Sequence, residues 1–183
     1  MTTTLIKEPN NDTDPSTDQD ARHKKFIFLT CITFVVIGID QLTKTYIHTQ
    51  LQLHESKIII ENLFSLTYVR NFGAAFGFLA QMPMLFRDVF FLSMPPLACG
   101  LILYILSTLK KNQTAQIIAL SSIFGGALGN YIDRLHYKYV IDFLDFHIQK
   151  YAWPTFNVAD MAIVGGVGLL VYHIIMEKNV SAD

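Results

Sequence analysis

The chain has 183 residues, of which 51% are hydrophobic and only 16% are charged, and its formal net charge is -1 at pH 7. This composition is too apolar for a protein whose whole surface meets water, and it predicts a small helical membrane protein. Because the Lys and Arg residues are scattered and form no basic stripe, we expect no nucleic-acid partner.

Residues 1–22 form the first predicted segment, a polar tail rich in Thr, Asn, Asp, Gln and Pro. Because the tail has no apolar face to bury, we expect it to be disordered. A basic cluster of Arg22, Lys24 and Lys25 follows, and the apolar segment after it has no fitting small-residue cleavage site. We therefore expect this segment to remain in the protein as a membrane anchor.

The first membrane span is predicted at about residues 26–47. The uninterrupted apolar run Phe26–Ile39 has only 14 residues, whereas a helix needs about 20 to cross the hydrocarbon core, so the helix must continue through Asp40 and Lys44. These two residues are one helical turn apart and are predicted to pair at the far membrane face. An ion pair that fixes the helix end and a part in catalysis both remain open for them.

A long connection at about residues 50–87 contains no run that is long enough to span a membrane. Within it, Leu63–Val69 is rich in β-branched and aromatic residues and partly alternates, which predicts a short strand. The small and aromatic residues over Arg70–Phe78 suit a strand or turn on the membrane surface, or an interfacial loop anchored by its aromatic side chains. We therefore predict a small extracytoplasmic β and loop subdomain between the first two helices.

The second and third spans are predicted as helices joined by a tight turn. The second, at about residues 89–109, has no charge and carries two adjacent prolines that should kink it. The turn falls at Lys110-Lys111, and the third span follows at about residues 115–132. Near its end, Gly125 and Gly129 form a GxxxG pattern, which indicates close helix packing.

The fourth span, at about residues 156–176, carries a single charge, Asp160, in its first turn. It completes the prediction of an α-helical membrane protein with four transmembrane helices. Asp142 precedes this span in an otherwise apolar stretch. An ionisable side chain in or beside a span is costly and therefore indicates a functional site, with structural ion pairing as the alternative.

The pair of Asp142 and Asp160 suits peptide hydrolysis. Two carboxylates held close cannot both ionise, so one pKa rises and the pair shares a proton. One carboxylate then acts as a base toward water and the other as an acid. Asn157 lies three residues before Asp160 on the same helix face, and its amide is predicted to orient one carboxylate. We expect no metal and no cofactor, since the six histidines show no HExxH spacing and no Cys or His cluster suggests zinc.

The other acids near this pair, Asp145 and Asp133, are expected to have different roles. If the segment around Asp142 is a strand, Asp142 and Asp145 point to opposite faces, and only one of them looks into the site. The apolar neighbours of Asp142 favour a raised pKa and so favour that residue. Asp133 is followed by Arg134, and we expect an ion pair there that ties down the end of the third helix.

Four spans place both termini on one side of the membrane. The basic residues on the terminal side are clustered in short segments beside the spans, where the positive-inside bias acts. We therefore expect both termini to be cytoplasmic and the active site to lie near the outer face. The polar candidates that then gather at the outer face are Asp40, Asn71, Asn130, Asp133, Asp142, Asn157 and Asp160.

These features resemble a known family, the lipoprotein signal peptidases (signal peptidase II) of bacteria. The resemblance runs from about Phe26 to Met176, and the polar tail before it is longer than the family leads us to expect. Five motifs in the family's order carry the resemblance: Asp40-Gln41 with Lys44, Asn71–Phe76, Gly125–Asn130 with Asp133-Arg134, Val140–Phe143, and Phe156–Asp160.

The resemblance implies an aspartic-type endopeptidase that removes the signal peptide from diacylglyceryl-modified prolipoproteins by cutting just before the lipid-modified cysteine. It places the catalytic aspartates at Asp142 and Asp160, in a peptidase domain of residues 23–178 that is followed by a short tail, 179–183. The candidate substrate-binding or supporting residues are Asp40, Lys44, Asn71, Gly73, Phe76, Asn130, Asp133, Arg134 and Asn157.

The resemblance also carries expectations about partners and location. It implies prolipoprotein substrates, contact with membrane lipid, inhibition by globomycin-type cyclic peptides, and a monomer in the bacterial cytoplasmic (inner) membrane. The segment Phe72–Phe78 resembles the part of the family that lies over the substrate at the membrane surface.

Two other classes of protein would also keep acids beside membrane spans. A small transporter or proton-conducting protein needs a relay, which acids gathered at one face do not provide. A structural membrane adaptor would explain the GxxxG pattern and the aromatic loop, but it would leave Asp142 and Asp160 unexplained. Cleavage of a lipid-modified precursor by the purified protein separates the peptidase from both.

Overall fold

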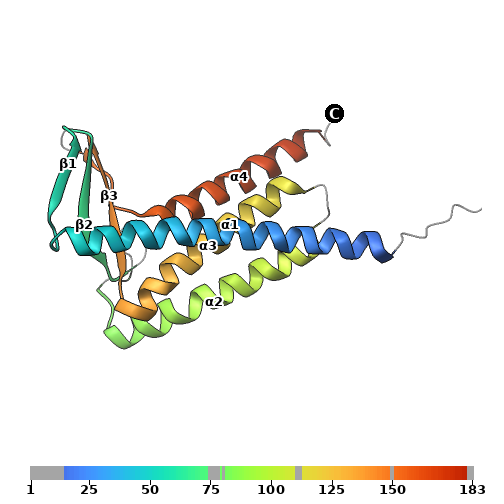
Figure 1. The fold of residues 1–183 in the computed structure, drawn as a ribbon, viewed down its shortest axis with the longest axis horizontal. Helices are drawn as coiled ribbons and strands as arrows, with labels where there is room; N and C mark the ends of the chain where they lie inside the picture. Colours follow the sequence, from blue (N-terminus) through green and yellow to red (C-terminus); the bar gives the residue numbers. More distant parts are fainter. Residues whose placement is uncertain (1–14, 74–78, 80, 110–112, 149–150, 181–183) are drawn as a thin grey trace, which may run out of the picture.

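The computed structural model describes residues 15–73, 79, 81–109, 113–148 and 151–180, in which four long helices form a bundle and a small sheet crosses one end of it (Figure 1). The helices are α1 (Pro15–Gln50), α2 (Met84–Thr108), α3 (Thr114–Tyr137) and α4 (Val158–Val180). Each of the four is long and apolar enough to cross a membrane. The prediction of a four-helix membrane protein is therefore confirmed.

The helix ends differ from the predicted spans. α1 begins at Pro15, inside the segment 1–22 that was expected to be a disordered tail, and proline suits the first turn of a helix because no N–H bond is lost there. α3 continues past its predicted end. It stops where Lys138 adopts a left-handed conformation (φ 65°) and donates its N–H to the carbonyl of Arg134. The predicted turn at Lys110-Lys111 lies outside the described residues.

The sheet is antiparallel, with the strand order β1-β2-β3-β4. Its strands are β1 (Ser56–Ile60), β2 (Phe64–Asn71), β3 (Val140–Ile148) and β4 (Tyr151–Ala152). The first two confirm the β subdomain predicted between helices α1 and α2. The other two come from between α3 and α4, and β3 pairs with β2 so that Asp142 lies opposite Val69. The sheet thus brings Asp142, from the connection between α3 and α4, beside β2, from the connection between α1 and α2.

α3 lies at the centre of the bundle, and its glycines let the neighbouring helices approach closely. A Cβ atom added to Gly125 would lie 3.0 Å from Cβ of Val36 on α1. One added to Gly129 would lie 2.7 Å from Oδ2 of Asp40 on α1 and 3.3 Å from Cβ of Ala159 on α4. The GxxxG pattern therefore packs α3 against both α1 and α4.

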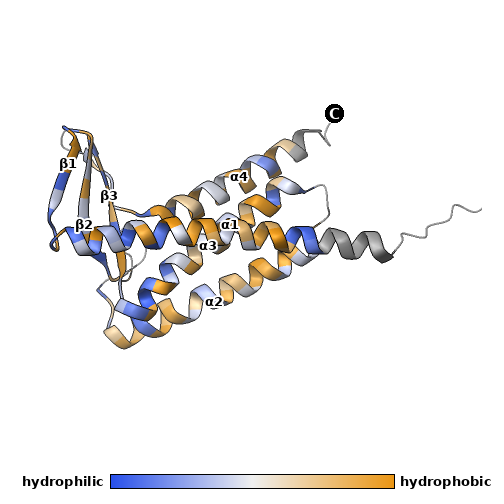
Figure 2. Ribbon diagram, in the orientation of Figure 1, coloured by the Kyte–Doolittle hydropathy of each residue, from blue (hydrophilic) through white to orange (hydrophobic). Residues whose placement is uncertain are grey.

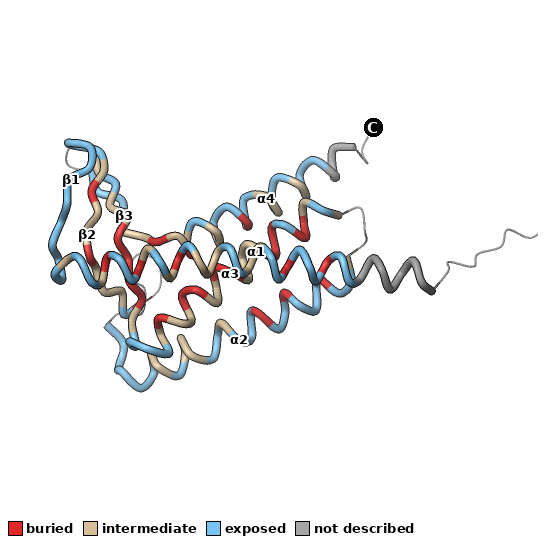
Figure 3. Tube along the Cα trace, in the orientation of Figure 1, coloured by how far each residue is buried: buried red, intermediate tan, exposed pale blue. Residues whose placement is uncertain are grey.

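The outward faces of the helices are apolar. Figure 2 shows hydrophobic residues along all four helices, with the polar residues of α1 and α3 concentrated near the sheet. Large side chains such as Phe34, Leu97 and Val164 are more than half exposed, whereas the buried residues gather along α3 and where the sheet meets the helices (Figure 3). Such a surface suits a hydrocarbon solvent, with the polar groups turned inward.

An apolar cluster joins the end of α1 to the sheet. It consists of Ile47 on α1, Tyr68 on β2, and Ile141 and Phe143 on β3. Because neighbouring residues of a strand point to opposite faces, burying Ile141 and Phe143 against α1 turns Asp142 to the other face of β3. The cluster thus sets the direction of that carboxylate.

Candidate active site

Asp142 on β3 and Asp160 in the first turn of α4 lie where the sheet meets the helices. Asp142 is buried, with only 2% of its surface exposed, and Asp160 is half-buried. Burial, and after it the negative charge of Asp160, raises the pKa of Asp142 to about 7. The negative charge of Asp160 therefore acts directly on the carboxyl group of Asp142.

Two asparagine amides hold the carboxylate of Asp142. Nδ2 of Asn71, at the end of β2, donates to Oδ2 over 2.9 Å. Nδ2 of Asn157 donates to Oδ1 over 2.6 Å. Both bonds favour the ionised form and partly oppose the rise in the pKa of Asp142. Because the donors come from two different elements, they fix the carboxylate between the sheet and α4.

Asp160 is held by Asn130 and by the beginning of its own helix. Nδ2 of Asn130 on α3 donates to its Oδ1 over 2.8 Å. The backbone N–H of Asn157 donates to its Oδ2 over 3.3 Å, while its own N–H donates to Oδ1 of Asn157 over 2.9 Å. This reciprocal pair is a capping box. The side-chain NH2 of Asn157 therefore faces Asp142, and not the Asp160 that shares its helix.

A buried ionic cluster of Asp40, Lys44 and Asp133 contacts Asn130. Nζ of Lys44 is 2.9 Å from Oδ2 of Asp40 and 3.0 Å from Oδ2 of Asp133. The same ammonium group donates to Oδ1 of Asn130 over 2.9 Å. The Asp40–Lys44 pair is thus present as predicted. The ion-pair partner of Asp133 is Lys44, whereas the sequence indicated Arg134, because adjacent residues of a helix point about 100° apart.

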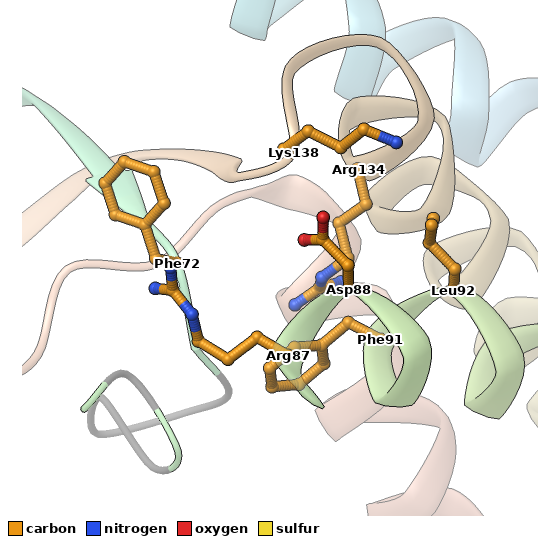
Figure 4. Close-up of a pocket in the computed structure, with 7 residues that line it drawn as sticks. All are labelled: Phe72, Arg87, Asp88, Phe91, Leu92, Arg134 and Lys138. Atoms are coloured by element: carbon orange, nitrogen blue, oxygen red, sulfur yellow. The ribbon is translucent and has the colours of Figure 1, made fainter. Parts of the chain in front are cut away.

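Arg134 connects α3 to the chain that follows β2. Its Nη2 donates to the carbonyl of Gly73 over 3.1 Å, and its Nη1 donates to the carbonyl of Asn130 over 3.3 Å. Its guanidinium also lies 4.8 Å from the centre of the Phe91 ring. Beside it is a small pocket between the end of β2, the start of α2 and the end of α3 (Figure 4). The pocket is lined by Phe72, Arg87, Asp88, Phe91, Leu92, Arg134 and Lys138.

Gln41 belongs to the ionic cluster but was not among the predicted site residues. Its Nε2 lies 3.1 Å from a carboxylate oxygen of Asp40 and 2.9 Å from one of Asp133. It also lies 3.2 Å from the carbonyl oxygen of Gly129. The sequence feature that could have identified Gln41 is its position next to Asp40 in the first of the five motifs.

The acid Asp145, weighed against Asp142 in the sequence, lies apart from this group. Asp145 is on β3 opposite Ser65, and it accepts a hydrogen bond from Oγ1 of Thr67 over 2.8 Å. Because β3 is a strand, Asp142 and Asp145 point to opposite faces. Phe76 lies outside the described residues, so its place over the substrate stays a prediction.

The arrangement suits acid and base chemistry. Every oxygen of the two carboxylates accepts a hydrogen bond from a side-chain amide or a backbone N–H, so both groups are oriented. A pair that shares one proton has a base for water and an acid for a carbonyl oxygen. Within the described ranges, no group of three or more His, Cys, Asp and Glu side chains is placed to hold a metal ion.

Comparisons with known proteins find relatives over most of the chain. A family model described as signal peptidase (SPase) II matches residues 32–176. A protein named lipoprotein signal peptidase from Syntrophus aciditrophicus is 46% identical over 157 residues, which cover 85% of this chain and 98% of that protein. One of the same name from Geobacter sulfurreducens is 45% identical over 148 residues, covering 79% and 91% of the two chains. A solved structure described as a bacterial membrane enzyme matches with a TM-score of 0.74 at 31% identity, covering 82% and 88%.

Proposed function

The chain belongs to the signal peptidase II family, and we propose that Asp142 and Asp160 are the catalytic pair of its active site. The protein is an aspartic-type endopeptidase that removes the signal peptide from diacylglyceryl-modified prolipoproteins by cutting just before the lipid-modified cysteine. One observation is the main support for choosing Asp142 and Asp160. The amides of Asn71, Asn130 and Asn157, from three different elements, converge on this pair of acids.

The two members of the catalytic pair have different surroundings, and we assign them different roles. Asp142 is the more deeply buried, and its raised pKa of about 7 lets it keep a proton near neutral pH. The ionised Asp160 takes a proton from water as the water oxygen attacks the scissile carbonyl carbon. Asp142 gives its proton to the carbonyl oxygen as negative charge develops there.

The second half of the reaction restores the pair. The tetrahedral intermediate carries two hydroxyl groups, and its carbon–nitrogen bond breaks when the leaving nitrogen receives a proton. Asp160, protonated in the first step, supplies that proton. Asp142 takes one proton back from a hydroxyl group as the new carboxyl group forms. Each carboxylate then has its original charge, and one water molecule has been consumed.

The asparagine amides orient the pair for these transfers. Oδ1 of Asn71 accepts the N–H of Gly73 over 2.9 Å, so the NH2 group of the same amide is left to face Asp142. We propose that Arg134, by binding the carbonyl of Gly73, keeps this stretch of backbone beside the catalytic pair. Phe76 follows shortly after, and its contact with the substrate belongs to the same proposal.

We also propose a location for the active site at the outer face of the bacterial inner membrane, with both termini in the cytoplasm. The start of α1 and the end of α4 lie at the end of the bundle opposite the sheet (Figure 1). Lys24 and Lys25 lie near that end, and Nζ of Lys25 is 2.5 Å from the carbonyl oxygen of Leu109 just after α2. Basic residues next to spans favour the cytoplasmic side.

Two further properties belong to the proposal. We expect inhibition by globomycin-type cyclic peptides, which follows from the family resemblance. We also expect the protein to act as a monomer, because both acids and all three amides that hold them come from one chain. A second copy is therefore not needed to complete the site.

The experiment that tests the proposal follows the mass of a precursor. Purified protein in detergent is incubated with a diacylglyceryl-modified prolipoprotein and, separately, with the same precursor without the lipid. We expect a free signal peptide and a product that begins at the modified cysteine in the first reaction, and no product in the second. A folded protein that leaves the modified precursor intact would contradict the proposed site.

A further inference from the structure

We propose that Lys44 is a positioning residue for the catalytic pair. Its buried ammonium group fixes the backbone that precedes each catalytic aspartate and the orientation of the amide that faces Asp160. This inference rests on the proposed function of the pair and deepens it. Lys44 acts through its contacts with Asp40, Asp133 and Asn130.

The ammonium group of Lys44 is enclosed by protein acceptors. The residue is only 1% exposed. Its Nζ lies 2.9 Å from a carboxylate oxygen of Asp40 and 3.0 Å from one of Asp133. The third acceptor is Oδ1 of Asn130, also at 2.9 Å. An ammonium group has three N–H donors and no acceptor, so these three oxygens account for its full donor capacity and leave it one orientation.

Each acid bound to this ammonium group also holds the backbone next to a catalytic aspartate. Oδ1 of Asp40 accepts the N–H of Ala159, the residue before the aspartate of α4, over 2.9 Å. Oδ2 of Asp133 accepts the N–H of Ile141, the residue before the aspartate of β3, over 3.0 Å. The two acids therefore connect one buried cation to both segments that carry the catalytic pair.

The third partner, Asn130, has an amide that fits in only one orientation. Its Oδ1 accepts from Lys44 and from Nδ2 of Asn157, the latter over 3.1 Å. Its Nδ2 donates to Asp160 over 2.8 Å. A reversed amide would place NH2 against an ammonium group and a second NH2, and would place its oxygen against a carboxylate. Lys44 thus excludes the orientation in which Asp160 loses this donor.

Charge balance is the competing role for Lys44. Two buried carboxylates need a positive charge nearby, wherever its N–H groups point. That role predicts that activity follows the net charge of the cluster and the amount of folded protein. Positioning predicts a lower kcat with little change in KM, because a buried group that acts on the catalytic pair affects the chemical step more than substrate binding.

The experiment separates the two roles with charge-matched variants. Lys44→Met removes the donor, but it leaves two buried acids without a cation and is at risk of not folding. The double variant Lys44→Met/Asp133→Asn loses one positive and one negative charge, so its formal cluster charge equals that of the wild type. The wild type is therefore the charge-matched reference, and Asp133→Asn alone, which keeps the ammonium group, measures the effect of losing that acid. Lys57→Met, on the exposed strand β1, is the matched control.

Each variant is purified in detergent, its thermal unfolding is recorded, and kcat and KM are measured on the diacylglyceryl-modified precursor. We expect the double variant to fold and to have a kcat at least about tenfold below those of both the wild type, whose cluster charge it shares, and Asp133→Asn, with KM within about twofold. Lys44→Met, where it folds, should show the same loss against the wild type. Lys57→Met should keep both constants.

Two results would overturn the inference. One is a folded double variant whose kcat equals that of the wild type, which would leave charge balance as the role of Lys44, or equals that of Asp133→Asn, which would leave the ammonium group no effect of its own. The other is a loss confined to KM. An error in the choice of the catalytic pair can be told apart from an error about Lys44, because only the former would leave Asp160→Asn active in the same assay.

Discussion

The side-chain nitrogen of Asn157 lies 2.6 Å from Oδ1 of Asp142, so the residue just before α4 also orients the aspartate of β3. Through its amide oxygen, the same side chain accepts the N–H of Asp160 over 2.9 Å. Asn157 thus caps a helix and holds a proposed catalytic carboxylate with one amide group. These two functions are separable by substitution.

Asn157→Ala removes both functions, whereas Asn157→Ser keeps a hydroxyl oxygen that caps the helix but does not reach Asp142. We expect Asn157→Ala to lower the free energy of unfolding by about 1 kcal/mol, and serine to restore most of that loss. We expect both variants to lower kcat at least about tenfold. Thermal unfolding in detergent and steady-state cleavage measure the two effects. Full cleavage by Asn157→Ser would show that the residue only begins the helix.

The raised pKa of Asp142 predicts the pH dependence of cleavage. Because Asp142 must be protonated to act as the acid, kcat should fall as the pH rises through about 7. Asn71→Ala removes a donor that favours the ionised carboxylate, so it should raise the pKa of Asp142 further and move this fall to higher pH. Profiles of kcat for the two proteins measure the shift.

The control for this profile is Thr67→Ala, because Thr67 donates to Asp145 and not to the proposed catalytic pair. Its profile should coincide with that of the wild type. A fall in kcat as the pH drops through the same range, with none as the pH rises, would make Asp142 the base and reverse the assigned roles.

Helix packing positions the proposed catalytic pair, and substitution of Gly126 tests this. A Cβ atom there would meet the backbone carbonyl of Ala159 and lie 2.8 Å from Cγ1 of Ile163, both on α4. We expect Gly126→Ala to displace the start of α4, to cost about 1–3 kcal/mol of stability, and to slow cleavage. Gly168→Ala, whose Cβ would meet nothing within 4 Å, should leave both unchanged. Equal effects of the two substitutions would contradict this packing argument.

The proposed orientation in the membrane predicts where reporters lie. A reporter fused after Asp183 should be cytoplasmic, and one inserted near Glu55, just before β1, should be outside the cytoplasm. Accessibility of the two fusions in intact cells and after lysis distinguishes the sides. The reverse pattern would place the active site on the cytoplasmic side, where an exported precursor does not reach it.

The helices and the first strands were predictable because their patterns are local. Three apolar runs of about membrane length and the shorter run Phe26–Ile39 indicated the four helices, and Leu63–Val69 indicated β2. β3 was not predicted as a strand, because the four residues Val140–Phe143 are all buried, so their polarity does not alternate with a period of two. The N-cap at Asn157 had a local signal, since Asp160 follows three residues later as in a capping box.

The partners of the site residues were less predictable, because they are set by tertiary packing. Lys44 pairs with Asp133 across two helices, whereas the sequence offered Arg134 as the adjacent cation. Similarly, spacing along α4 placed Asn157 near Asp160, but the capping box uses its oxygen and turns its NH2 toward β3. The motifs identified most of the members of the site, and the fold decides which atoms meet.

The most direct test of the central claim, that Asp142 and Asp160 are the catalytic pair, is cleavage of a diacylglyceryl-modified precursor by three matched variants. Asp142→Asn and Asp160→Asn should give no detectable product while remaining folded in detergent. Asp145→Asn should retain substantial activity, because the Asp145 carboxylate lies on the other face of β3 and accepts a hydrogen bond from Thr67 of β2. Cleavage by folded Asp142→Asn or Asp160→Asn, or an equal loss in folded Asp145→Asn, would contradict the claim.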